Sequence, residues 1–196
     1  MPGKSPACLP PACPALRKAD GNWTTFGEVA AVAGPIGTVT SIATASAAGQ
    51  LQVAAVSGGK AYHTIRNTTG NWGTWGNVAQ AAGATGPINY IAMAGVGDDA
   101  HIVTSTDSGA NQYHAMRKAS GSWDPFTSLS GVLGTITTRS VSTTHVNGEL
   151  QVAVVTTANQ PLHTIRHADR TWAPTTPVPV TGIKGNPGNI TITGTL

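Results

Sequence analysis

The sequence predicts an all-β protein, a β-propeller of about four blades in which each blade is a four-stranded antiparallel sheet. Three observations predict this fold. An arginine followed six positions later by a tryptophan recurs four times, and the tryptophans are 49, 51 and 49 residues apart. Each interval holds four short runs of alternating, β-branched residues separated by Gly, Asn, Asp or Ser, which is typical of hairpin strands. No window of about 11 residues has sustained helical periodicity, so we expect almost no helix.

The repeated motif lies within longer stretches that are also alike. The stretches around the tryptophans read LRKADGNWTTFGEV, HTIRNTTGNWGTWGNV, HAMRKASGSWDPFTSL and HTIRHADRTWAPTTPV. Upstream, GQLQVAAVSGGKAYHTIR at 49–66 matches GELQVAVVTTANQPLHTIR at 148–166, and DDAHIVTSTDSGANQYHAMR is a diverged middle copy. Four strands in about 50 residues is the size of one propeller blade, and blades bury their faces only by stacking on neighbours.

The four strands of each repeat follow in a fixed order. The first strand is expected at 40–46, 89–95, 139–144 and 189–194. The second is expected at 51–56, 100–104 and 150–155, and the third at 62–66, 113–117 and 162–166. The fourth begins at the tryptophan. A glycine before it, as in Asp20-Gly21, supplies the positive φ of a tight hairpin turn.

Residues 1–15 form an irregular segment, and the predicted propeller occupies 16–196. Three blades span roughly 38–79, 87–129 and 136–178, and a fourth is split between 16–30 and 187–196. The split blade lacks a second strand. We therefore expect a fragment of a larger ring, or a chain that completes its ring by association as a homo-oligomer.

Composition excludes several classes of protein. Of the 196 residues only 10% are charged, and the net charge of +3 comes from scattered basic residues. Neither a disordered tail nor a nucleic-acid partner is expected. No apolar run approaches about 18 residues, so no membrane insertion is expected. The Gly-, Thr- and Ser-rich composition is typical of an extracellular β-protein, although prolines leave no recognisable signal peptide at the start. We expect export by another route or, preferably, a true N-terminus further upstream.

Cys8 and Cys13 both lie in the irregular opening segment. The sequence leaves three alternatives for them: closing a small loop, binding a metal with outside help, or no role. No histidine or further cysteine completes a zinc site, so neither a metal nor another cofactor is expected.

His63, His114 and His163 occupy the same position in three repeats, and Pro14 stands there in the fourth. In an extended His-Thr-Ile-Arg segment, histidine and isoleucine share one face while threonine and arginine share the other. The structural interpretation puts the histidine in the core between blades, donating to a backbone carbonyl, because recurring positions in repeat proteins are usually packing positions. The functional interpretations are a ligand for a sugar hydroxyl at the blade edge or, from three blades together, for one central ion.

Two further residues recur in all four repeats. The arginines are Arg17, Arg66, Arg117 and Arg166. Their guanidinium fork suits a carboxylate, backbone carbonyls or vicinal hydroxyls, and it can equally pin the loop of the next blade. The tryptophans are Trp23, Trp72, Trp123 and Trp172. Each offers a flat apolar face for the C–H face of a sugar, or it fills the blade core.

Catalysis has little support in the sequence. Among eight carboxylates, only the turn residues Asp20 and Asp169 recur. A propeller glycosidase would need two carboxylates across a cleft. Serine hydrolase, P-loop, HExxH and dinucleotide motifs are absent. The diverged middle repeat offers His101 and Asp107 without an evident partner, so we expect no enzyme activity.

At HTIR and GNWGTWGNV the sequence resembles the repeats of the tectonin-like and fucose-binding propeller lectins, over roughly residues 15–196. The resemblance implies sugar sites between adjacent blades, built from the repeated Arg and Trp and from the His three residues before each Arg. The fucose-type pattern has a Glu partner in each site. Here Glu149 is matched by Gln50 and by Asp98 or Asp99 in the other copies, so fucose itself is not expected.

These observations lead to one favoured function and two alternatives. We expect a multivalent, lectin-like module that binds glycans or glycoproteins at sites between blades, since repeated weak sites gain avidity on a glycan-covered surface. The first alternative is a non-catalytic protein-interaction or structural propeller, and the second is a propeller glycosidase.

Overall fold

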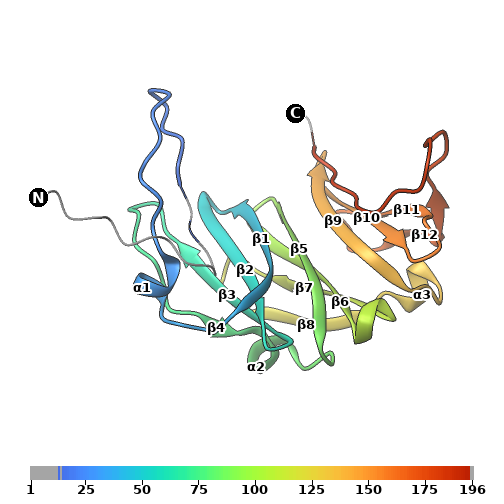
Figure 1. Ribbon diagram of the computed structural model, residues 1–196, viewed down its shortest axis with the longest axis horizontal. Helices are drawn as coiled ribbons and strands as arrows, with labels where there is room; N and C mark the ends of the chain where they lie inside the picture. Colours follow the sequence, from blue (N-terminus) through green and yellow to red (C-terminus); the bar gives the residue numbers. More distant parts are fainter. Residues whose placement is uncertain (1–12, 14, 195–196) are drawn as a thin grey trace, which may run out of the picture.

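The computed structural model describes residue 13 and residues 15–194, apart from the side chains of 175–178. Its strands form three separate four-stranded antiparallel sheets that follow one another in chain order (Figure 1). Sheet 1 contains β1 (Val39–Ala47), β2 (Gln50–Ser57), β3 (Lys60–Arg66) and β4 (Gly76–Asn77). Sheet 2 contains β5 (Ile88–Val96), β6 (Asp99–Thr106), β7 (Asn111–Arg117) and β8 (Trp123–Ser128). Sheet 3 contains β9 (Thr138–Val146), β10 (Glu149–Thr156), β11 (Pro161–Arg166) and β12 (Trp172–Pro179). The all-β prediction is confirmed.

Helix is confined to short turns between the sheets. α1 (Val29–Ala33) precedes sheet 1, α2 (Val78–Ala82) precedes sheet 2 and α3 (Ser130–Leu133) precedes sheet 3. A 3-10 turn, η1, covers Asp107–Gly109. Each α-helix stops at a glycine with positive φ, because that residue leaves the helical conformation without a Cβ clash. No helix in the described part of the chain is long and apolar enough to span a membrane.

Tight turns and local hydrogen bonds fix the pairing inside each sheet. Gly58 and Gly59 join β2 to β3 with φ of 54° and 71°, the two positive values that a type I′ hairpin turn requires. In sheet 1 this turn sets the register in which Ala54 is the partner of His63. The Thr64 hydroxyl donates to the carbonyl of Gly73 at 2.7 Å and holds the chain as it turns back beside β3.

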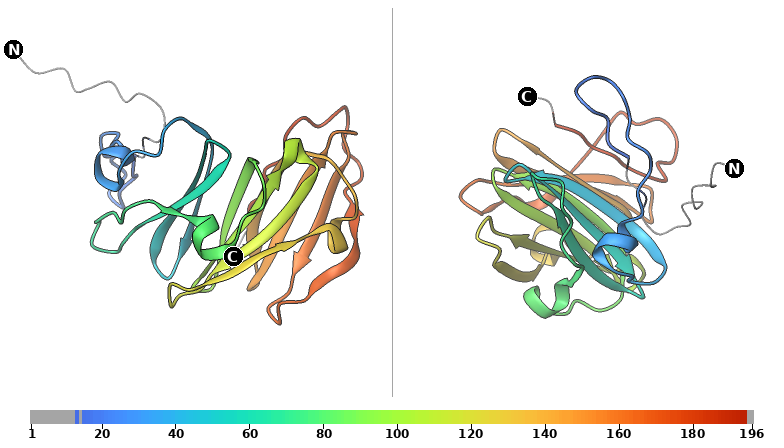
Figure 2. Two further views of the ribbon diagram at one scale, coloured as in Figure 1. Left: turned by 90° about the horizontal axis from the view of Figure 1, so that it is seen from below. Right: turned by 90° about the vertical axis from the view of Figure 1, so that its left-hand side faces the viewer.

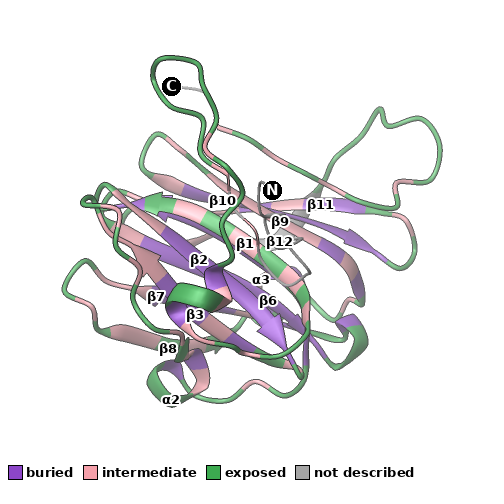
Figure 3. Cartoon of the chain, turned by 60° about the vertical axis from the view of Figure 1, so that its left-hand side comes forward, coloured by how far each residue is buried: buried purple, intermediate pink, exposed green. Residues whose placement is uncertain are grey.

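The hydrophobic core is divided between two sheet interfaces. One cluster joins sheets 1 and 2 through residues such as Val56, Val78 and Ile102, and a second joins sheets 2 and 3 through Val103 and Leu150. The second strand of each sheet is buried along most of its length, because neighbouring elements cover both of its faces (Figure 3). The sheets therefore stand face to face in a row, as the views in Figure 2 show.

The first strands β1, β5 and β9 lie side by side along the inner edge of this row. The Ser41 hydroxyl accepts from the backbone N–H of Ile91 at 3.3 Å across the first junction. A Cβ added at Gly95 would overlap the carbonyl oxygen of Ser46, so this close approach requires glycine. Corresponding ends of the three strands line one cavity of about 210 Å³, formed by 44–46, 93–95 and 143–145.

The segment predicted as a further first strand, 189–194, has no strand assignment. It nevertheless lies beside β9 as β5 lies beside β1. The N–H groups of Ile190, Ile192 and Gly194 donate to the hydroxyls of Ser140, Ser142 and Thr144 at 3.2, 3.1 and 2.8 Å. The strand prediction was wrong because, among the described residues, no second strand pairs with this segment as β6 pairs with β5.

The two parts of the predicted split blade lie at opposite ends of the row. Leu16 and Thr24 line a cavity together with Leu51 and Arg66 of sheet 1, and 187–194 lies against sheet 3 (Figure 1). None of the three sheets includes either part. Cys13 is disulfide-bonded, which favours the small loop over a metal site or no role. Cys8 and Pro14 lie outside the described residues.

Candidate functional site

The repeated histidines are each hydrogen-bonded to the second strand of their own sheet. His63 and His114 lie at sheet interfaces, and His163 lies on the outer face of sheet 3. His63 Nε2 is 2.9 Å from Gln52 Oε1, and His163 Nε2 is 2.9 Å from Gln151 Oε1. The prediction that these histidines donate to a backbone carbonyl was wrong, because the partner of each is a glutamine side chain. In the register of sheet 1, Gln52 lies two residues from the partner of His63, so both side chains emerge on the same face and meet diagonally.

The middle repeat replaces this pair by two histidines. His101 stands at the position of Gln52, and its Nδ1 is 2.9 Å from Nε2 of His114. Both imidazoles are buried, and their rings are tilted by 33° at a centroid distance of 5.2 Å. His101, which lacked an evident partner in the sequence, is therefore bonded to the repeated histidine of its own sheet.

The tryptophans meet the histidines of the preceding sheet. Trp123 of sheet 2 contacts His63 of sheet 1 edge-on, with centroids 5.4 Å apart and an interplanar angle of 84°. Trp172 of sheet 3 contacts His114 of sheet 2 in the same way, at 5.5 Å and 85°. The structure thus brings together residues that the sequence assigns to successive repeats.

The arginines accompany the tryptophans. Arg117 is the cross-strand partner of Trp123, and Arg66 pairs with Trp72 in the same manner. Within one sheet the arginine and the histidine lie on opposite faces, in agreement with the alternation read from the sequence. The arginine faces the preceding sheet, where the charge of Arg117 acts on His63.

Burial keeps the interface histidines neutral. It lowers the pKa of His63 to about 4, and the charge of Arg117 lowers this pKa further. The pKa of His101 also lies at about 4, chiefly through burial and then through the charge of Arg166. Burial, His101 and Arg166 hold the pKa of His114 well below its ordinary value. Near neutral pH these rings therefore act as uncharged donors and acceptors.

A cavity with several charged and polar side chains lies between sheets 2 and 3, and we name it cavity II. Its volume is about 260 Å³, and its lining includes Asp99, His101, Met116, Leu150, Arg166 and Arg170. Met116 and Leu150 supply apolar surface. Two guanidinium groups, a carboxylate and a neutral imidazole lie beside them.

The charged groups around cavity II are held by neighbours. The Asp99 carboxylate accepts from the backbone N–H of Ala119 at 2.9 Å. Glu149, the counterpart of Asp99 in sheet 3, has an oxygen 2.7 Å from Nδ1 of His167, which also lines the cavity. Arg170 reaches Asp124 of sheet 2 at 3.7 Å. These contacts hold the charged side chains of the rim in place.

A related cavity, cavity I, lies between the 16–27 segment and sheet 1. Its volume is about 210 Å³, and its lining includes Leu16, Thr24, Leu51, Arg66 and Trp72. Leu16, Leu51 and Arg66 occupy the repeat positions of Met116, Leu150 and Arg166 in cavity II. The same repeat position therefore supplies an arginine to both cavities.

Arg17 and Trp23 are the exception among the predicted site residues. They are cross-strand neighbours like the other pairs, but both are exposed, and 65% of the surface of Trp23 is accessible. No sheet covers them in the described part of the chain.

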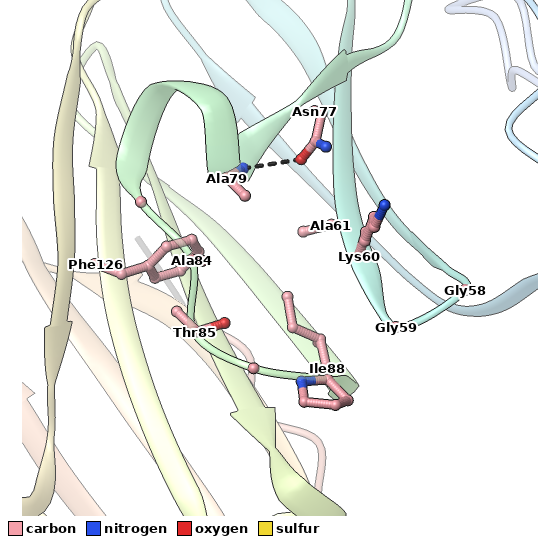
Figure 4. A pocket seen from close by; sticks show the side chains of 13 residues that line it. Gly58, Gly59, Lys60, Ala61, Asn77, Ala79, Ala84, Thr85, Ile88 and Phe126 are labelled. Carbon is pink, nitrogen blue, oxygen red and sulfur yellow. Dashed lines mark hydrogen bonds between the residues drawn. The ribbon is translucent and has the colours of Figure 1, made fainter.

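A larger cavity of about 310 Å³ lies between sheets 1 and 2 near the β2–β3 turn (Figure 4). Lys60, Ala61, Ile88 and Phe126 contribute to its wall. The Asn77 side chain already accepts from the N–H of Ala79 at 3.0 Å. The wall is mostly apolar and contains none of the predicted site residues, so it has few groups that could orient a saccharide.

The proposed central ion is not supported by the geometry. His63 lies at the first interface and His114 at the second, each against a tryptophan, so they do not converge on one point. Among the described residues no group of three His, Cys, Asp or Glu side chains could hold a metal.

Sequence reasoning missed Gln52, Gln151, His167 and Arg170. Gln52 and Gln151 could have been found, because each is the only polar residue of the predicted strand 51–56 or 150–155 and shares its repeat position with His101. His167 and Arg170 belong to a turn that varies between repeats, so recurrence gives no signal there.

No protein-family model matches the sequence, and no curated protein matches it. Among solved structures, the chain is similar to a single-residue mutant of the NanB sialidase from Streptococcus pneumoniae, with 13% identity and a TM-score of 0.48 over 79% of this chain and 26% of that one. A structure of NanB plus Optactamide is similar at 13% identity, with a TM-score of 0.40 over 63% of this chain and 20% of that one. This chain therefore covers 26% or less of the length of either structure.

Proposed function

We propose that the three sheets are consecutive blades of a β-propeller and that the chain is a multivalent, non-catalytic carbohydrate-binding module. One observation carries the proposal: the repeated arginine lines a cavity between neighbouring units twice, as Arg66 in cavity I and as Arg166 in cavity II. A site that recurs with the repeat suits a ligand that also recurs, such as the terminal sugars of a glycan-covered surface.

The chemistry of both cavities suits a saccharide ring. A planar guanidinium donates to two vicinal hydroxyls at once, and apolar side chains accept the C–H face of the sugar. Cavity I adds the indole of Trp72 and the hydroxyl of Thr25. Cavity II adds Asp99 as an acceptor and neutral His101, which can either donate or accept. Volumes of about 210 and 260 Å³ lie just below the usual range for drug-sized ligands, so each cavity suits about one sugar ring.

Calorimetric titration with a monosaccharide, chosen from a glycan array probed with the folded chain, tests the proposal. Arg66→Ala and Arg166→Ala should each lower the stoichiometry by one equivalent per chain, and the double variant should lower it by two. On a dense glycan surface each single variant should lose about tenfold or more in apparent affinity, because avidity depends on simultaneous engagement.

Arg139→Ala is the matched control, because it removes an arginine that lines neither cavity. This variant should keep both the stoichiometry and the surface affinity of the wild type. A folded wild-type chain that binds no glycan, or arginine variants that bind unchanged, would rule the proposal out.

A protein-interaction module is the second candidate, and a separate observation favours it. Trp23 and Phe26 are 65% and 71% exposed on one end of the row of sheets. Exposed aromatic residues are enriched at protein interfaces. If Trp23→Ala abolished binding to a protein partner while glycan binding stayed intact, the exposed aromatic residues would form a protein-binding surface separate from the glycan sites.

A further inference from the structure

The two outer faces of the row of sheets are complementary halves of an interface that the chain already forms twice. At both inner junctions, the histidine of one sheet meets the edge-on tryptophan of the next, with centroid distances of 5.4 and 5.5 Å. Each of the two junctions also contains its own buried apolar cluster. This repeated geometry is a template for how a further unit would dock.

One outer face carries the tryptophan half, and we name it the tryptophan face. It consists of Arg17, Trp23 and Phe26, which occupy the repeat positions of Arg117, Trp123 and Phe126. Trp123 and Phe126 pack against the cluster between sheets 1 and 2, whereas Trp23 and Phe26 are 65% and 71% exposed. Thr24, Thr25 and Gly27 of the same segment line cavity I against sheet 1, whereas Trp23 is not part of that lining.

The other outer face carries the histidine half, and we name it the histidine face. His163 is bonded to Gln151 at 2.9 Å, as His63 is to Gln52, so the ring is already oriented. In the described part of the chain, ring contacts occur at His63 and His114 and have no counterpart at His163. Segment 187–194 lies beside β9 next to this face, where the first strand of a following unit would stand.

We propose that copies of this chain associate head to tail, with the tryptophan face of one copy docked on the histidine face of the next. The occupant is a second copy because each face lacks the partner that the other supplies. Segment 187–194 would provide the inner element of the shared unit, and the Arg17–Trp23 hairpin with α1 would provide its outer elements. The two faces lie at opposite ends of the row (Figures 1 and 2), so the contact is intermolecular.

The association would also add a binding position. Arg17 would face the preceding sheet as Arg166 does, and a cavity equivalent to cavity II would form at the joint. Because the interface is heterologous, it produces a closed ring or an open chain of copies, depending on the rotation between them. The inference does not depend on the proposed glycan binding.

Sedimentation and light scattering of the full chain test this association. The wild type should have a mass that is a multiple of 19.8 kDa and that rises with concentration. Trp23→Ala and His163→Ala should each raise the dissociation constant about tenfold or more, because a central aromatic contact is a typical hot spot. Tyr90→Ala is the control and should associate like the wild type, since Tyr90 is an exposed aromatic residue of the middle sheet.

An equimolar mixture of the two variants separates this interface from a folding defect. The Trp23→Ala copy keeps an intact histidine face, and the His163→Ala copy keeps an intact tryptophan face, so the mixture should form dimers and nothing larger. A wild type that stays at 19.8 kDa, or a mixture that stays monomeric, would overturn the proposal.

Discussion

Acid should destabilise the chain because its interface histidines are buried in the neutral form. The free pKa of an imidazole is 6.5, and in the folded chain burial and Arg117 lower the pKa of His63 to about 4. Above 6.5 neither state is protonated, so this part of the stability is fully present. As the pH falls below 6.5, His63 becomes protonated in the unfolded chain, whereas in the folded chain it stays neutral down to about pH 4. Stability is therefore lost between these two values.

The magnitude follows from proton linkage. For each such histidine the free energy of unfolding should fall by about 1.4 kcal/mol per pH unit inside the window. The full loss for His63 is about 3 kcal/mol, which is a large share of the stability of an ordinary domain. The pair of His101 and His114 adds a slope of the same sign.

Urea unfolding, followed by tryptophan fluorescence between about pH 7 and 5, measures this slope. His63→Gln removes the titrating ring and keeps an amide that can donate to Gln52, so its slope should be smaller by about 1.4 kcal/mol per pH unit. His163→Gln is the matched control at the half-buried position of sheet 3, where burial lowers the pKa to a smaller extent. Its slope should change less. Equal slopes for the wild type and His63→Gln would refute the reasoning.

Two further predictions concern the close contact at Gly95 and the hydrogen bonding of buried threonine hydroxyls. Gly95→Ala should cost about 1–3 kcal/mol or more in thermal or urea unfolding, because its Cβ would overlap the Ser46 carbonyl, and Gly131→Ala, with open space around it, should cost nothing. A stable Gly95→Ala variant would contradict the close contact of β1 and β5. Thr104→Val should leave stability unchanged or raise it by about 1 kcal/mol, since its buried hydroxyl has no partner among the described residues. Thr64→Val should lose about 1 kcal/mol with its hydrogen bond, and the reverse order in urea midpoints would contradict this assignment.

Much of the fold was readable from local pattern. The alternation of side chains in HTIR placed His63 and Arg66 on opposite faces of one strand, because a strand has a period of two wherever it lies. The glycine before the tryptophan, as in Asp20-Gly21, marked a tight turn, and Gly21 has the expected positive φ of 86°. The 50-residue spacing then defined the unit, and each unit became one four-stranded sheet except at the two ends.

The candidate site was only half readable. The sequence identified the arginines of cavities I and II from their recurrence, and it placed the recurring histidines between blades without identifying their partners. The tertiary structure pairs His63 with Trp123 of the next repeat, and it makes Gln52 the hydrogen-bond partner of His63. Diagonal neighbours on one face become visible only when the register of β2 and β3 is known.

The sequence by itself determined the all-β class, the length of the repeat and the face on which each recurring side chain emerges. These properties depend on short-range periodicity and turn chemistry, which every segment carries within itself. Only the tertiary structure decided which sheet each face meets, that 189–194 bonds through the hydroxyls of β9, and that no further sheet of the described chain covers Trp23 or His163. The physical reason is that contacts between sheets depend on how two complementary surfaces stack, and no single repeat specifies the neighbour that will cover it.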